Sequence, residues 1–368
     1  MAVNGALDTA EIRALTSTGN IREDLMAKVW DVSRTPLPFQ DRIGTGTCSS
    51  NIHEWTMDKL GTAAANAYVE NASVPETGTT SAPTDIGNSA SSANVIRARN
   101  HCQISGKAVT VSKRSQDVQT SGNTASLAYQ LMQRQRELRQ DMEFTLLSNT
   151  ASLAGNATTT APLLGGYLSW VEDKTSPTQN LFVSAAATPS ADGGYDESTL
   201  LTTAAASTAT VAAISEADLR DAIEAVYNGG AEASVAMCRP SLKRIISQYM
   251  YTSSARIAQL TSEVGQGTTG QDVARGAVSV FISDYGVVEL VPNRHFPFQA
   301  STTHEFVAVF DPAYLSVDYL SNVNVIEQPI AGLQDSRLMY ADYTLRVSSD
   351  QAIAAIADVS PTGAMTAT

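Results

Sequence analysis

Residues 124–149, TASLAYQLMQRQRELRQDMEFTLLSN, carry the clearest structural signal in this chain. Apolar residues recur there at spacings of four and seven, which places them on one face of an α-helix. We expect this face to form the buried core stripe of the helix, made of Leu127, Leu131, Leu138, Met142 and Leu146. Asn123 is the predicted N-cap, because its side chain can accept a hydrogen bond from a free amide of the first turn.

A long two-stranded excursion precedes the helix. The stretch 51–70 opens with period-two alternation, and 95–112 is predicted to be the strand that returns. The segment between them is small, polar and interrupted by prolines and glycines, so it cannot bury enough apolar surface to form a core. We therefore predict an extended loop over 48–112 that is ordered by docking elsewhere, because a lone two-stranded ribbon is only marginally stable in water.

The remaining segments mix helices with antiparallel pieces. Residues 1–47 are predicted to be an extended arm, and 155–212 to be loop-rich, with a surface insertion near 172–212. A helix is predicted over 215–232, with a Ser215–Asp218 capping box at its start and Gly229-Gly230 at its end. A buried strand at 233–238 and a helix that begins at Pro240 follow. The last predicted elements are a hairpin over 278–294 with Gly286 in its turn, two short strands around Asp311-Pro312, and a late strand at 337–349 that 351–360 extends. The order is that of an α+β protein rather than a regular βαβ alternation.

Composition narrows the classes of function. With 368 residues and 17% charged side chains, the chain is long enough for two or three folded lobes. The net charge of −13 argues against general nucleic-acid binding, which needs clustered Lys and Arg. No basic region followed by an apolar one resembles a signal peptide, and no apolar run reaches the ~20 residues of a membrane span. We expect a protein that stays in the cytoplasm or assembles there, without membrane contact.

No pattern of catalytic residues is visible. The cysteines Cys48, Cys102 and Cys238 are far apart in sequence and lack a CxxC spacing, so three free thiols are expected rather than a disulfide framework or a zinc site. The histidines His53, His101, His295 and His304 have no metal-ligand spacing, and neither a P-loop nor a GxSxG elbow occurs. The prediction is a non-enzymatic protein without catalytic residues, cofactor or metal.

One electrostatic feature is asymmetric along the chain. Residues 91–140 hold eight basic and two acidic side chains, whereas 301–368 hold eight acidic and two basic ones. Two such regions could be complementary between copies of the chain, or both could be solvated faces. On the first interpretation the inter-subunit contacts are Arg97, Arg99, Lys107, Lys113 and Arg114, while Arg134, Arg136 and Arg139 of the helix lie away from its apolar face.

The sequence of arm, long ribbon, long helix and α+β lobe resembles the major capsid proteins of tailed bacteriophages, with the Hong Kong 97-type fold. The stretches that carry the resemblance are TPLPFQDRIGTGTCSSNIHEWTMDKL, SKRSQDVQTSG followed by LAYQLMQRQRELRQDMEFTLLSN, ISDYGVVELVPNR and FDPAYLSVDYL. These stretches show a general likeness of sequence rather than catalytic motifs, and together they span most of residues 36–350.

The resemblance implies a division of the chain and a function. It implies an N-terminal arm (1–47), an extended loop (48–112), a peripheral domain with a spine helix (113–154 and 331–368) and an axial domain (155–330). Hexamers and pentamers of the chain would form an icosahedral virion capsid around double-stranded DNA, bound without sequence specificity, after assembly in the host bacterial cytoplasm. Portal, scaffold and decoration proteins would be further partners. An encapsulin-like cellular shell and an acidic surface-layer or adhesive protein stay open as alternatives.

Overall fold

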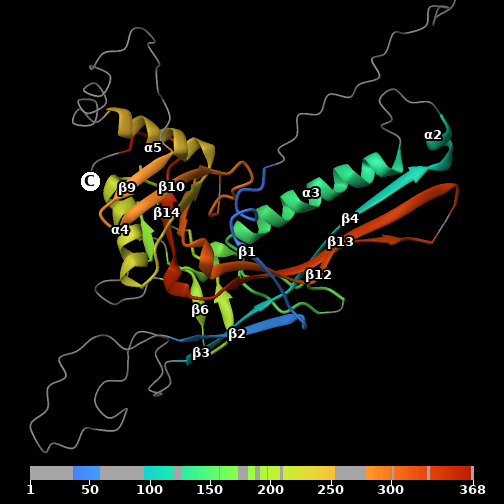
Figure 1. Cartoon of the computed structure of the whole chain (residues 1–368), viewed down its shortest axis with the longest axis horizontal. Coiled ribbons are helices and arrows are strands. Elements are labelled where there is room, and N and C mark those ends of the chain that lie inside the picture. Colours follow the sequence, from blue (N-terminus) through green and yellow to red (C-terminus); the bar gives the residue numbers. More distant parts are fainter. Residues whose placement is uncertain are drawn as a thin grey trace, which may run out of the picture.

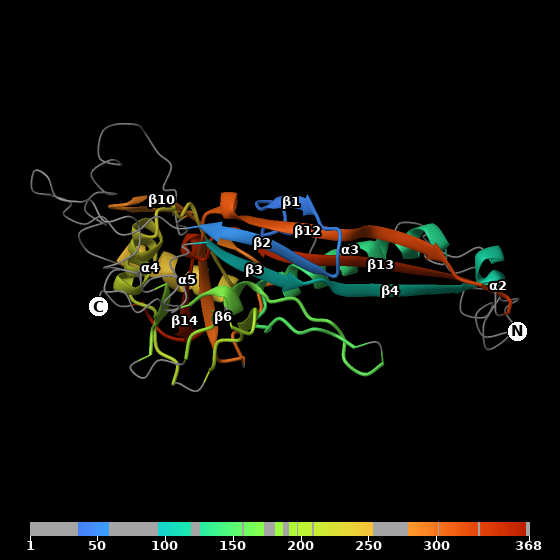
Figure 2. The same cartoon turned by 90° about the horizontal axis from the view of Figure 1, so that it is seen from below.

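The computed structural model describes residues 36–58, 95–118, 126–156, 158–172, 181–186, 191–196, 198–207, 210–252, 279–300, 302–329 and 332–365. These form an elongated subunit with two lobes, each built on its own β-sheet (Figures 1 and 2). We call them the long lobe, which contains the helix α3, and the compact lobe, which contains α4 and α5.

The long lobe is a four-stranded sheet with a helix running beside it (Figure 1). The strand order is β1 (Gly44–Thr47), β12 (Leu315–Glu327), β13 (Gln334–Val347) and β4 (Gln103–Ser112). The β1–β12 pair is parallel and the other two pairs are antiparallel. The helix α3 (Leu127–Leu147) packs on this sheet, and a short helix α2 (Lys113–Asp117) follows β4. The lobe is long because β12 and β13 are long and paired with each other.

The predicted long helix is present, although it is shorter at both ends than 124–149. It begins after Ser126 and ends before Ser148, whereas the predicted N-cap Asn123 lies outside the described residues. The apolar stripe is fully buried only in its second half, where Leu138, Met142 and Leu146 are at most 1% exposed. The stripe residues of the first half, Leu127 and Leu131, are half-buried against the core.

The compact lobe is a six-stranded mixed sheet that carries helices α4 (Glu216–Asn228) and α5 (Pro240–Thr252). Its strand order is β5 (Phe182–Ser184), β14 (Ile353–Val359), β11 (Glu305–Phe310), β8 (Val235–Cys238), β10 (Gly286–Pro292) and β9 (Val280–Ser283). Every residue of β8, β11 and β14 is buried, which explains their nearly continuous apolar sequences. These three central strands form the core of the lobe.

Several local predictions for this lobe are confirmed. Ser215 and Asp218 form the reciprocal capping box of α4, and Gly230 has a φ of +92° just beyond the end of that helix. Pro240 is the first residue of α5. The hairpin of β9 and β10 turns at Gly286, whose φ of +143° is strained for any residue with a side chain. Local turn chemistry therefore specified these elements.

Two small antiparallel pairs complete the described fold. The ribbon consists of β2 (Ile52–Asp58) and β3 (Val95–His101), which pair along their whole length and lie in the lower half of Figure 1. The brace hairpin consists of β6 (Gly194–Asp196) and β7 (Leu201–Thr203). Single 3₁₀ turns occur at η2 (Tyr167–Trp170), η3 (Pro312–Tyr314) and η4 (Asp350–Ala352).

Sheet membership corrects the predicted segment boundaries. The return strand does not run unbroken over 95–112, because Cys102 separates β3 from β4 and β4 pairs with β13 in the long lobe. Residues 351–360 do not extend the late strand, because β14 crosses into the compact lobe to pair with β11 and β5. Conversely β12, inside the predicted segment 155–330, belongs to the long lobe. Long-range pairing of this kind leaves no local trace in the sequence.

Candidate assembly surfaces

The root of the ribbon is tied to β13 and to the loop before η2 by one buried side chain, Asn100. Its amide nitrogen donates to the carbonyl oxygens of Gly165 (3.2 Å) and Leu345 (2.8 Å). Its amide oxygen accepts from the backbone N–H groups of Gly165 (2.8 Å) and His101 (3.0 Å). All four hydrogen-bonding positions of the amide are thereby used in a site from which water is excluded. The direction in which the ribbon leaves the subunit is therefore fixed at Asn100.

A second contact braces the ribbon from the side. The Trp170 ring stacks on Tyr195 of the brace hairpin with centroids 5.3 Å apart, and Trp55 of β2 lies 5.5 Å from Trp170. The Tyr195 hydroxyl donates to the Arg97 carbonyl at 2.9 Å. The Arg99 guanidinium donates to the carbonyl of Leu200 at 2.9 Å, at the turn of the hairpin. The region predicted only as a surface insertion thus holds the ribbon within its own subunit.

A third junction holds the segment before β1. The buried Glu143 carboxylate of α3 accepts from the backbone N–H groups of Phe39 (2.7 Å) and Gln40 (3.0 Å) and from the Asn293 amide (2.8 Å). Burial raises the pKa of Glu143, and the three donors oppose that rise. Phe39 itself is fully buried and makes an edge contact with Phe310, so this part of the predicted arm packs on its own subunit.

The predicted inter-subunit cations mostly contact groups of the same subunit. Arg97 pairs with Glu54 across the ribbon, Lys107 with Asp141 (2.6 Å) and Lys113 with Asp335 (2.5 Å). Arg99 binds the brace hairpin as described above. Among the described residues, Arg114 is the exposed member of this group for which no ion pair is found.

The acidic end of the chain is only partly exposed. Four of its eight carboxylates, on Glu305, Asp318, Asp350 and Asp358, are buried. Asp318 pairs with His53 (2.8 Å) and Arg346 (3.3 Å), and Glu305 with Arg239 (3.2 Å). The charge count along the sequence could not reveal that these groups neutralise one another inside the fold.

Apolar side chains are exposed in both lobes. On the β9–β10 hairpin, Ile282 and Val287 are 78% and 59% exposed and face each other across the pair. In the long lobe, Ile104 is 61% and Leu333 86% exposed. Neighbouring exposed apolar residues, such as Ile282 and Val287, are typical of contacts with other protein chains.

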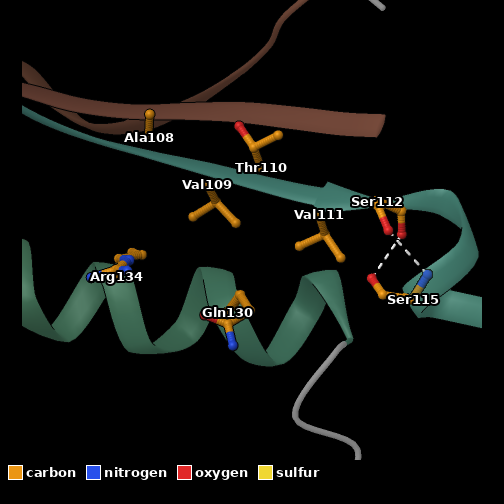
Figure 3. Close-up of a pocket in the computed structure, with 8 residues that line it drawn as sticks. All are labelled: Ala108, Val109, Thr110, Val111, Ser112, Ser115, Gln130 and Arg134. Carbon is orange, nitrogen blue, oxygen red and sulfur yellow. Dashed lines mark hydrogen bonds between the residues drawn. The ribbon is translucent and has the colours of Figure 1, made fainter. Parts of the chain in front are cut away.

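A pocket of about 280 Å³ separates the first half of α3 from β4. Figure 3 shows Val109 and Val111 pointing from β4 toward the helix, while Thr110 points away. Gln130 and Arg134 line the helix side. The pocket lies beside the half of α3 that also contains the half-buried Leu127 and Leu131.

The histidines and cysteines show no catalytic grouping. Across the described ranges, no three His, Cys, Asp or Glu side chains are placed to hold a metal ion. His53 pairs with Asp318, and the buried His101 shares a 2.8 Å hydrogen bond with Ser152. Burial lowers the pKa of His101. The structure does bring Cys48 and Cys102 together, with sulfurs 3.6 Å apart, which their separation in the sequence concealed. No helix of the described chain is long and apolar enough to span a membrane.

Comparison with known proteins identifies the family to which this fold belongs. The chain matches the family model of the SU10 major capsid protein over residues 9–360, so it belongs to that family. It is a major capsid protein with the Hong Kong 97-type α+β fold, as its sequence predicted. No curated protein sequence matches it.

Solved structures share the fold at low sequence identity. The capsid of an empty GTA particle has a TM-score of 0.58 at 12% identity, covering 98% of this chain and 100% of the other. The capsid of the cyanophage P-SCSP1u has a TM-score of 0.53 at 12% identity, with coverage of 96% and 98%. The SrpI encapsulin from Synechococcus elongatus PCC 7942 has a TM-score of 0.51 at 13% identity, with coverage of 98% and 99%.

Proposed function

We propose that copies of this chain form hexamers and pentamers that tile an icosahedral virion capsid around double-stranded DNA. Membership of a major capsid protein family is the observation that carries this proposal. On this proposal the long lobe acts as the peripheral domain, with α3 as its spine helix, and the compact lobe acts as the axial domain. The ribbon is the root of the extended loop.

The distribution of contacts supports a subunit built for lateral association. The ribbon is held in a fixed direction by Asn100 and the brace hairpin, and the segment before β1 is held by Glu143. A neighbouring copy therefore meets a pre-organised surface. The exposed apolar residues of the β9–β10 hairpin and the long lobe supply area that a second copy can bury. The family is a structural one, and we propose that the chain has no enzymatic activity and needs no cofactor or metal.

The net charge of −13 fits a container for DNA rather than a sequence-specific binder. An acidic wall holds DNA weakly, which allows the DNA to be packed and released. Assembly in the host bacterial cytoplasm, with portal, scaffold and decoration proteins as further partners, belongs to the same proposal. The shared fold with an encapsulin keeps a cellular shell as the second candidate. Nuclease-protected DNA inside purified particles supports the capsid, whereas a protein cargo without DNA supports the second candidate.

A deletion tests the role of the loop. Residues 71–94, which lie outside the described residues, are predicted to be ordered only against a neighbouring subunit, and the deletion removes 74–92 of them. A chain without them should remain folded, with the circular dichroism and melting temperature of the intact subunit. It should assemble poorly, which sedimentation velocity measures. Shells of normal yield and stability from the deleted chain would overturn this role.

A further inference from the structure

Two cysteines meet where the ribbon joins the long lobe. Cys48 follows β1, and its N–H donates to the Tyr319 carbonyl of β12 at 3.0 Å. Cys102 lies between β3 and β4, and its N–H donates to the Asn51 carbonyl at 2.9 Å. Both cysteines are therefore held by the backbone on either side of the ribbon root. Their sulfurs are 3.6 Å apart, so small side-chain rotations bring them within the ~2.05 Å of a disulfide.

The two thiols differ in access, while the third cysteine is isolated. Cys48 is half-buried, whereas Cys102 is only 3% exposed. Cys238 is completely buried in β8 of the compact lobe. Burial and the nearby carboxylates of Asp318 and Asp342 raise the pKa of Cys48, and burial raises the pKa of Cys102. Both groups are therefore protonated thiols at neutral pH, and they react slowly in a reducing cytoplasm.

We propose that Cys48 and Cys102 are a modification site that forms an intrachain disulfide and closes the root of the ribbon covalently. This inference rests on the proposed function for its timing. A particle that is assembled in a reducing cytoplasm and then released into oxidising surroundings acquires the bond after assembly. The bond locks the ribbon in the direction that Asn100 and the brace hairpin set by hydrogen bonds and ring contacts.

The chemistry requires a low-molecular-weight disulfide such as oxidised glutathione as the oxidant. The Cys48 thiol loses its proton and attacks one sulfur of that disulfide, which forms a mixed disulfide and releases one reduced thiol. Cys102 then loses its proton and attacks the Cys48 sulfur, and the second reduced thiol leaves with the electron pair. Two protein thiols are oxidised, the small disulfide is reduced by two electrons, and the two protons end on the released thiols.

The experiment treats the purified, unassembled chain with oxidised glutathione and then counts its thiols under denaturing conditions. The expected result is the loss of two of the three thiols, together with one cross-linked peptide pair that contains residues 48 and 102 and a mass lower by two hydrogen atoms. Cys238→Ser, the matched control, should form the same cross-link. Cys48→Ser and Cys102→Ser should each fail to form it.

An unchanged thiol count in the folded wild-type chain would overturn the proposal, as would a cross-link found only between chains on a non-reducing gel. In particles, oxidation should raise the temperature of disassembly, and a reductant should reverse the gain. If the cross-link forms but no shells are ever obtained, the thiol pair stands and the proposed capsid function fails. If shells form and the thiols stay free, the proposed capsid function stands and the proposed disulfide fails.

Discussion

Replacement of Asn100 tests how the ribbon is fixed to the subunit. Asn100→Ala removes the acceptor of two buried N–H groups, on Gly165 and His101. An unsatisfied buried donor costs about 1–3 kcal/mol, so the two together cost ~2–6 kcal/mol. The Gly165 carbonyl keeps its hydrogen bond from the Trp170 indole at 3.2 Å, so the free-energy cost of an unsatisfied acceptor is not added for that carbonyl. The expected result is a large loss in the free energy of unfolding.

Asn100→Asp separates hydrogen bonding from side-chain volume. The aspartate keeps both acceptor functions but turns a carboxylate oxygen toward the carbonyls of Gly165 and Leu345, to which the amide donated. We expect this variant to be at least as destabilised as Asn100→Ala, because it adds a buried charge that faces two carbonyl oxygens. The matched control is Asn324→Ala on the exposed part of β12, which should cost less than about 0.5 kcal/mol.

The assay is urea unfolding of the unassembled subunit, followed by tryptophan fluorescence. Trp55 and Trp170 report on the ribbon and on the brace contact, because they lie 5.5 Å apart beside Tyr195. The midpoint should fall for both Asn100 variants while the slope with urea stays unchanged. If Asn100→Asp were as stable as the parent, the amide would not be donating to the two carbonyls, and the account of the ribbon root would be refuted.

Three further predictions follow from named contacts. Leu138→Ala, at a position 1% exposed, should lower the free energy of unfolding by ~2–5 kcal/mol in thermal or urea unfolding. Leu131→Ala, at the half-buried end of the stripe, should cost clearly less, and equal losses would contradict the pattern of burial along α3. Arg99→Glu should lower the melting temperature of the subunit, because it breaks the contact between Arg99 and the brace hairpin. Arg114→Glu, at an exposed position, should leave the melting temperature nearly unchanged. The opposite ranking would refute the intrasubunit role of Arg99. Because burial raises the pKa of Glu143, its contribution to stability is fully present below the ordinary glutamate value of ~4.3 and is lost as pH rises through the raised value. Glu143→Gln should flatten that part of the stability–pH curve, and a curve identical to that of the parent would show that another group titrates there.

The parts of the fold that depend on local chemistry were predictable. The capping box at Ser215, the proline start at Pro240 and the glycine turn at Gly286 each act through neighbouring backbone, so their residues appear close together in the sequence. The period of the apolar residues predicted α3, although the burial of its first half depends on how closely β4 approaches.

The parts that depend on distant pairing were not predictable. Nothing local indicates that the chain breaks at Cys102 and that β4 pairs with β13, or that β14 returns to the compact lobe. The intrachain ion pairs were hidden for the same reason, since Lys113 meets Asp335 and His53 meets Asp318 only after folding. The assembly role came instead from the resemblance of the whole order of segments to a family, and the match over 9–360 confirms it.

The ribbon, the charged residues and α3 serve the proposed function only if the chain assembles. Electron microscopy of the purified full-length protein, under conditions that promote assembly, tests this most directly. We expect closed shells of uniform diameter with icosahedral symmetry and subunits arranged as hexamers and pentamers. A protein that stays monomeric under all such conditions, or that forms only open sheets or fibres, would contradict it.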